Sequence, residues 1–84
     1  MKQLLITFRS VTYAQRGERV LGAAGIRCVI QRTPKWMEQQ GCGYSLRLQW
    51  EDGERAVGLL RREGIPLRRV YRGREDGTYR EVML

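Results

Sequence analysis

Ala24-Gly25-Ile26 and Glu63-Gly64-Ile65 are the two stretches that decide the fold of this chain. In each of them a glycine ends a segment with helical periodicity, and an isoleucine opens a segment with the character of a strand. Glycine is favoured at such an end because a helix is often followed by a residue in the left-handed conformation. The repeated pattern divides the chain into two strand–helix–strand halves.

Two strands are expected in the first half. Residues 4–9 alternate between apolar and mixed positions, which predicts a strand. The second strand is expected over residues 26–31, where Ile26, Cys28 and Ile30 share one side. Cys28 is therefore expected to fill the core as a small apolar side chain.

A helix is expected between these two strands. Thr12 is followed three residues later by Gln15, a spacing that resembles a capping box, so the helix is predicted from Thr12 to Ala24. The apolar positions that share its inner face are Ala14, Gly17, Leu21 and Ala24.

The second half is interpreted in the same way. A third strand is expected over residues 44–50, and Asp52 is the predicted N-cap of a helix over residues 53–63. A fourth strand is expected over residues 67–72. Asp76-Gly77 then predicts a tight two-residue hairpin turn, which adds a short edge strand.

Two such halves in a chain of 84 residues predict an α+β fold. The usual packing of the order βαββαβ is a ferredoxin-like sandwich: an antiparallel sheet of strand order 4-1-3-2 with both helices on one face. Residues 1–72 are expected to form this domain. Residues 73–84 are expected to form a C-terminal extension that contributes the added hairpin strand.

The candidate functional residue is Cys42, which lies between Gly41 and Gly43 just ahead of the third strand. The two glycines leave little bulk beside the sulfur, so backbone amides can approach whatever it carries. The chain has no histidine, and this thiol is the one evident soft nucleophile at a loop-to-strand junction. The simpler interpretation is a turn cysteine without chemistry.

The predicted topology places Cys42 beside the start of the first helix, because the third strand begins at the edge where the first strand ends. A helix N-terminus favours an anionic sulfur. A short helical turn expected over residues 33–40 disfavours the thiolate, because Cys42 follows its C-terminal, negative end. This turn is too short for a full helix dipole, so the first helix is expected to dominate. The residues expected to bind and stabilise the sulfur are Arg9, Ser10, Thr12 and Lys35, together with the flanking glycines.

Charge and composition limit the function classes. The net charge of +7, from 16 basic and 9 acidic residues, suggests an anionic partner, although a solvated surface explains scattered arginines equally well. Two cysteines without histidine cannot supply a four-ligand zinc site, so neither a metal nor a cofactor is expected. No apolar run of ~18 residues and no secretory signal is recognisable, so a cytoplasmic protein without membrane contact is expected.

Several motifs, in this order, resemble the small bacterial domains of unknown function called the putative selenium/sulfur (Se/S) carrier protein-like family. The resemblance covers residues 3–72. The matching residues are Leu5-Ile6-Thr7-Phe8, Ala24-Gly25-Ile26, Thr33-Pro34-Lys35, Cys42-Gly43 and Gly64-Ile65-Pro66.

This resemblance implies that Cys42 carries sulfur or selenium as a persulfide or selenopersulfide and passes it from a donor to an acceptor. The implied donor is a cysteine desulfurase-like enzyme or an enzyme of selenium metabolism, and a small sulfur-relay protein is a further implied partner. The chain itself is not expected to be an enzyme, since the thiol has no evident proton acceptor. A homodimer is left open.

Two other function classes compete with the carrier. An assembly or regulatory module would act through the sheet face that the helices leave open, where Leu5, Val29 and Val70 are expected. An RNA-binding domain is less favoured: βαββαβ is also the RNA-recognition architecture, but that module stacks bases on aromatic side chains of its central strands, and the first strand offers only Phe8. Nucleic acid is therefore not the expected partner.

Overall fold

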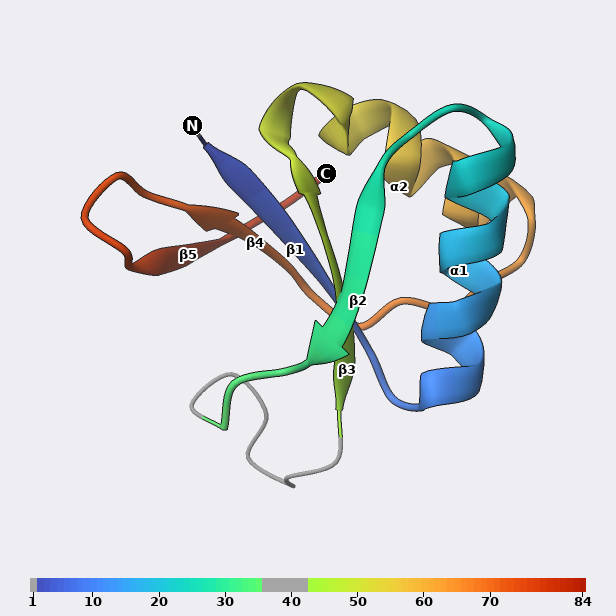
Figure 1. Cartoon of the computed structure of the whole chain (residues 1–84), viewed down its shortest axis with the longest axis horizontal. Helices are drawn as coiled ribbons and strands as arrows, with labels where there is room; N and C mark the ends of the chain where they lie inside the picture. The colour runs from blue at the N-terminus through green and yellow to red at the C-terminus, as the bar shows by residue number, and fades with distance from the viewer. Residues whose placement is uncertain (1, 36–42) are drawn as a thin grey trace.

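The structure is a computed structural model that describes residues 2–35 and 43–84. Within these ranges, two α-helices cover one face of a five-stranded antiparallel sheet (Figure 1). The helices are α1 (Val11–Ala23) and α2 (Gly53–Arg62), and the short 3-10 helix η1 (Trp50–Asp52) leads into α2. The strands are β1 (Gln3–Phe8), β2 (Cys28–Arg32), β3 (Tyr44–Gln49), β4 (Val70–Gly73) and β5 (Tyr79–Val82).

The predicted class, α+β with an antiparallel sheet and two helices, is confirmed, and the sheet differs in detail from a four-stranded one. Its order is β2-β3-β1-β4-β5. The part from β4 to β2 corresponds to the expected order 4-1-3-2, and β5 pairs with β4 as a fifth strand at that edge. β1 is central and pairs with both β3 and β4. The end of β1 and the start of β3 therefore meet at one edge of the sheet.

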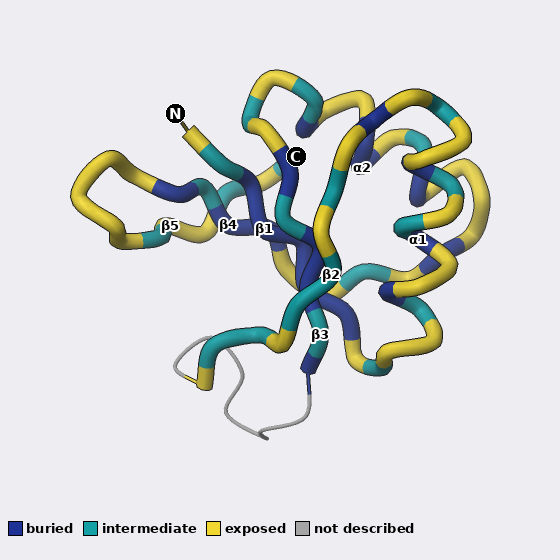
Figure 2. The backbone as a smooth tube through the Cα atoms, viewed as in Figure 1, coloured by how far each residue is buried: buried dark blue, intermediate teal, exposed yellow. Residues whose placement is uncertain are grey.

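The main core lies between the sheet and the helices. Leu4, Ile6 and Phe8 alternate along β1, are fully buried and face the helices, as the sequence predicts. Figure 2 shows the buried backbone concentrated in β1 and the strands beside it. Burial of each such side chain is worth about 1.5–3 kcal/mol. The helices contribute Ala14, Leu21, Ala56, Val57 and Leu60 to the same cluster.

Both helices end as the repeated glycine pattern predicts. Gly25 has a backbone φ of 80° and Gly64 one of 70°, values that residues with a Cβ rarely adopt. After α1, the N–H of Ile26 donates to the carbonyl of Leu21 at 2.9 Å, and after α2 that of Ile65 donates to Leu60 at 3.0 Å. These bonds satisfy carbonyls at the helix ends and turn the chain back toward the sheet.

The predicted N-cap of α1 is wrong, whereas that of α2 is confirmed in its position. Ser10, not Thr12, caps α1: its Oγ accepts a hydrogen bond from the N–H of Tyr13 at 3.3 Å. Asp52 does occupy the N-cap position of α2, but its backbone is already helical and its side chain makes no capping hydrogen bond. The reason is η1, which begins at Trp50, so the third strand ends one residue earlier than expected and the chain enters α2 already coiled.

The fourth strand is shorter than expected because a bulge precedes it. Thr7 faces both Arg68 and Arg69: its carbonyl accepts from the N–H of Arg68 at 2.8 Å, and its N–H donates to the carbonyl of Arg69 at 2.9 Å. The Oγ1 of Thr7 also accepts from the N–H of Arg69 at 3.0 Å. Two residues therefore oppose one, and regular pairing starts only at Val70.

The predicted hairpin and its added strand are present, but the prediction of a two-residue turn between the strands is wrong. The N–H of Gly77 donates to the carbonyl of Arg74 at 3.1 Å, which centres the turn on Glu75 and Asp76. Gly77 follows with φ of 87°, and Arg74 then pairs with Thr78 through a 2.7 Å hydrogen bond. Gly77 is needed for the left-handed residue that closes a three-residue loop.

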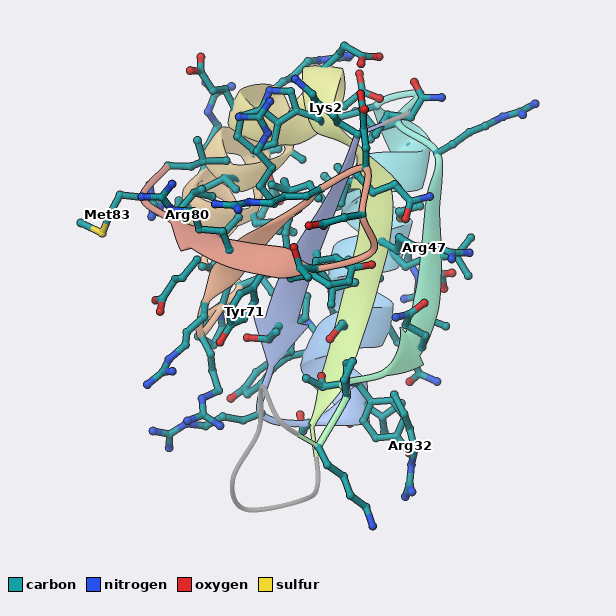
Figure 3. The ribbon with its side chains drawn as sticks, turned by 90° about the vertical axis from the view of Figure 1, so that its left-hand side faces the viewer. Lys2, Arg32, Arg47, Tyr71, Arg80 and Met83 are labelled. Carbon is teal, nitrogen blue, oxygen red and sulfur yellow. The ribbon has the colours of Figure 1, made fainter. Side chains whose placement is uncertain are left out.

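The sheet face opposite the helices has its own small apolar cluster. Leu5 and Tyr71 are buried there, and Tyr79 of β5 packs against them. Figure 3 views this face, with Tyr71 lying over the centre of the sheet. The expectation that Val70 lies on this face is wrong, because Val70 belongs to the main core on the helix side. Val29 does remain exposed on the edge strand β2.

Candidate functional site

Of the predicted site residues, Gly41 and Cys42 lie outside the described residues, as does most of the turn predicted over residues 33–40. Gly43 is described: it is buried and directly precedes β3. Its carbonyl accepts a hydrogen bond from the N–H of Thr33 at 3.0 Å, which closes the pairing of β2 with β3. The neighbouring Tyr44 is paired with Phe8, so Gly43 lies where β1 ends.

α1 begins at this same edge. Ser10 is half-buried and uses both of its oxygens for the helix, since its carbonyl also accepts from the N–H of Ala14 at 3.2 Å. No residue within 2–35 or 43–84 accepts from the N–H groups of Val11 or Thr12. The first turn of α1, described in full, carries no acidic residue. The positive end of the helix is therefore not neutralised by its own side chains.

The structure thus brings four predicted site residues to one edge: Arg9, Ser10, Thr12 and Gly43. Arg9 is exposed and connects β1 to the cap of α1. Thr12 is exposed in the first turn of the helix, at the same edge but not as the cap. Lys35 is exposed and lies beyond the Thr33–Gly43 hydrogen bond, where the chain leaves β2.

A basic hollow next to this edge was not predicted. It measures about 480 Å³ and lies between the start of α1 and the segment before β4. Its cations are Arg9, Arg68 and Arg69, and the Thr7 bulge fixes the backbone of the last two. The available sequence signal was the adjacent pair Arg68-Arg69 just before a strand. The other residues that line it are Tyr13, Pro66 and Leu67.

A row of hydroxyl groups lies on the open sheet face. Ser45 is fully buried, and its Oγ shares a 2.5 Å hydrogen bond with the Oγ1 of Thr33. Thr7 is paired opposite Ser45 and is buried as well. The bond between Thr33 and Ser45 ties the end of β2 to β3 and so fixes the position of Gly43. Alternate polar residues in strand-like segments were the sequence signal for this row.

Cys28 has surroundings unsuited to nucleophilic chemistry. It is half-buried and packs against the main core, in line with the predicted apolar role. Burial raises the pKa of the Cys28 thiol, and the negative charge of Glu18 raises it further. The thiol is therefore held in its protonated, less reactive form.

The described residues contain no group of three potential metal ligands close together. They also contain no helix with the length and hydrophobicity that a membrane-spanning segment needs.

Comparison with known protein families gives a match. The sequence model of the family described as "Putative Se/S carrier protein-like" matches residues 3–72. The matched range contains both strand–helix–strand halves and Cys42, and it ends within β4, so that β5 and the turn before it lie outside. No curated protein and no solved structure matches the chain.

Proposed function

Because the chain belongs to the putative Se/S carrier protein-like family, we propose that it carries sulfur or selenium on the thiol of Cys42. The chalcogen is held as a persulfide or selenopersulfide. Membership of the family confirms the resemblance seen in the sequence, whereas the carried form, the site and the partners are our proposal. In it the chain is a carrier and not an enzyme.

One observation carries the assignment to Cys42. Gly43, its direct neighbour, lies at the edge of the sheet where α1 begins. The amides of Val11 and Thr12 have no acceptor among the described residues, and Arg9 adds a positive charge beside them. A terminal persulfide sulfur is anionic at neutral pH and is stabilised by such amides and cations. The described end of this site therefore suits an anionic cargo.

The second cysteine supports the same assignment by contrast. The chain contains two cysteines. Cys28 is partly enclosed by the core, and its pKa is raised, so its thiolate is scarce at neutral pH. A carrier needs a thiolate that donor and acceptor can both reach. This leaves Cys42 as the better candidate.

The transfer that we propose is a thiol–disulfide type of exchange. The Cys42 thiolate attacks the outer sulfur of a persulfide on the donor protein, forming a new S–S bond. The S–S bond of the donor breaks, and the donor leaves as a thiolate, so no external oxidant or reductant is consumed. A donor selenopersulfide reacts in the same way at selenium. Attack by an acceptor thiolate on the loaded Cys42 then repeats the exchange.

The partners follow from this chemistry. The donor in our proposal is a cysteine desulfurase-like enzyme or an enzyme of selenium metabolism, and the acceptor is a small sulfur-relay protein. The basic hollow formed by Arg9, Arg68 and Arg69 lies beside the start of α1 and offers an acidic partner surface a complementary contact. The setting that we propose is the cytoplasm, where thiols stay reduced.

The structure favours the two alternative functions less. Phe8 is fully buried and faces the helices, so it is not available to stack on a base. On the open face, Leu5 is covered by the protein's own tyrosines, and Val70 points to the other side of the sheet. The apolar patch that an assembly surface needs is thereby reduced to Val29 at the β2 edge.

Intact mass spectrometry after incubation with a cysteine desulfurase and cysteine tests the proposal. The expected gain is about 32 Da for one sulfur, or about 79 Da for one selenium when selenocysteine replaces cysteine as the substrate of the donor, and reductant should reverse it. Cys42→Ala should abolish loading. The matched control Cys28→Ala should load like the wild type. Full loading of Cys42→Ala, or none of the wild type with several donors, contradicts the proposal.

A further inference from the structure

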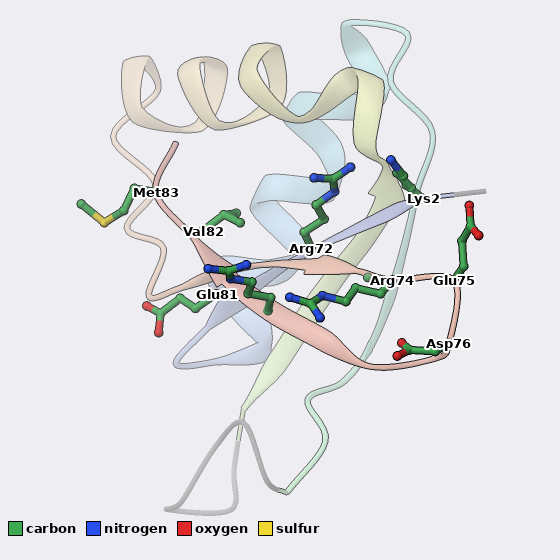
Figure 4. Close-up of a pocket in the computed structure, with 10 residues that line it drawn as sticks. Lys2, Arg72, Arg74, Glu75, Asp76, Glu81, Val82 and Met83 are labelled. Atoms are coloured by element: carbon green, nitrogen blue, oxygen red, sulfur yellow. The ribbon is translucent and has the colours of Figure 1, made fainter.

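A second hollow lies at the opposite sheet edge, in the part of the chain outside the family match. It measures about 740 Å³ and is formed by the β4–β5 hairpin together with the start of the chain. Figure 4 shows Lys2 and Arg72 extending to the same side of the hairpin. The basic residues that line it are Lys2, Arg72, Arg74 and Arg80.

The strand register explains why these cations gather. Arg72 is paired directly opposite Arg80, and Arg74 pairs with Thr78, so the three arginines project from the helix side of the hairpin. The alternate face of the hairpin carries Tyr71 and Tyr79. Like charges directly opposite each other destabilise a sheet. The pairing of Arg72 with Arg80 therefore destabilises the hairpin locally, and a bound anion would relieve this charge repulsion.

Three of the four cations of this hollow lack counter-ions in the described structure, and the exception is Arg74, whose positive charge helps to lower the pKa of the Asp76 carboxyl. Within residues 2–35 and 43–84, neither Lys2 nor Arg80 forms an ion pair, and Arg72 makes only a cation–π contact, 4.6 Å from the ring centre of Trp50. That contact holds the Arg72 side chain in place beside η1. The backbone of Lys2 is also held, since its carbonyl accepts from the N–H of Trp50 at 3.1 Å.

The acidic residues around the hollow do not offset these charges fully. Asp76 lies in the turn, and its carboxylate accepts from the N–H and the Oγ1 of Thr78, at 3.0 and 2.6 Å. Glu81 is paired with Tyr71 in the sheet and also lines the hollow (Figure 4). Glu75 extends from the turn at the rim (Figure 4). The lining thus holds four basic and three acidic residues, so positive charge remains in excess.

We propose that this hollow binds a small molecule through a diphosphate or triphosphate group. Two neighbouring phosphates can bridge the Arg72–Arg80 pair and reach Arg74 or Lys2, and guanidinium groups bind phosphate oxygens in a bidentate way. The volume of the hollow lies in the range of small-molecule sites, about 300–1,000 Å³. A nucleic-acid strand is a different partner, and the experiment separates the two. The site is independent of Cys42.

Calorimetric titration with inorganic pyrophosphate, at constant ionic strength, tests this site. The wild type should bind one pyrophosphate per chain, with chemical-shift changes at residues of β4 and β5. Arg80→Gln should weaken the affinity about tenfold or more, the usual loss for one charge-assisted contact. Arg80 is chosen because it leaves the Arg72–Trp50 contact intact. The matched control Arg27→Gln removes an exposed arginine ahead of β2, at the other edge of the sheet, and should bind like the wild type.

Three results overturn the proposal. The first is the absence of pyrophosphate binding by the wild type. The second is equal weakening by Arg80→Gln and Arg27→Gln, which indicates a net-charge effect and not a site. The third is tight binding of a single-stranded homopolymer RNA by a protein that does not bind pyrophosphate, which assigns the hollow to a nucleic-acid backbone.

Discussion

At the scale of single residues, the surroundings of the two cysteines divide their roles. Cys28 lies on the helix-facing side of the edge strand β2, with Leu48 of β3 opposite. It is only half-buried, so its part in the core is smaller than that of Ile26, which is almost fully enclosed. Partial burial and Glu18 are nevertheless enough to disfavour its thiolate.

The raised pKa of Cys28 affects the stability of the protein at high pH. Because the pKa of Cys28 is raised in the folded protein, the unfolded chain loses this proton first as the pH rises. The folded state then binds more protons than the unfolded state, so the contribution of Cys28 to stability falls with rising pH. We expect this loss to begin above about pH 8.5, the pKa of a free cysteine.

Denaturant unfolding of the wild type and of Cys28→Ala between neutral and alkaline pH measures the effect. The difference in unfolding free energy between the two proteins should be constant at neutral pH. Above about pH 8.5 the wild type should lose unfolding free energy relative to Cys28→Ala. The other titrating groups are present in both proteins, so their contributions cancel in the difference. A difference that stays flat up to strongly alkaline pH contradicts the raised pKa.

At the scale of the elements, the start of α1 matters both for the fold and for the proposed site. Ser10 ends the turn that follows β1 and provides the capping oxygen for Tyr13. Thr12, two residues later, already belongs to the helix and is exposed. The two hydroxyl residues are thus close in sequence but differ in what they do.

Substitution of these two residues forms a matched pair. Ser10→Ala should lower the unfolding free energy by about 1 kcal/mol, because the N–H of Tyr13 loses its acceptor. Thr12→Ala should change it by less than about 0.5 kcal/mol, as is usual for an exposed position. Thermal and denaturant unfolding provide the measurement. A larger loss for Thr12→Ala would restore the capping box predicted from the sequence.

At the scale of the whole molecule, the C-terminal residues return to the start of α2. Leu84 lies close to Gly53, the first residue of that helix. If Gly53 carried a Cβ, this atom would lie 3.4 Å from the Cδ1 of Leu84. Val82 and Leu84 both pack against the main core. The hairpin is therefore joined to the rest of the fold by side chains as well as by the pairing of β4 with β5.

Leu84 and its neighbour Met83 allow this connection to be tested. Leu84→Ala should lower the unfolding free energy by about 1 kcal/mol, less than for a fully buried leucine because Leu84 is only half-buried. Met83 is 96% exposed, so Met83→Ala should have almost no effect. Equal effects of the two substitutions in denaturant unfolding would show that Leu84 does not contribute to the core.

The sequence by itself determined the class of the fold, both helix ends and the family. Gly25 and Gly64 were predictable because few other residues adopt a positive φ at low cost. The alternation of Leu4, Ile6 and Phe8 identified the inner face of β1, since strand side chains point to opposite sides in turn. These are local rules, and they operate within a few residues.

The tertiary structure decided what depends on contacts between distant residues. The bulge at Thr7 involves Arg69, which is 62 positions away, so the start of β4 could not be predicted from its own sequence. The choice of Ser10 over Thr12 as the cap depends on where β1 stops pairing with β3. The pairing of Arg72 with Arg80 depends on the length of the turn between them. In each case the decisive energy comes from a backbone partner or a charge that folding alone brings near.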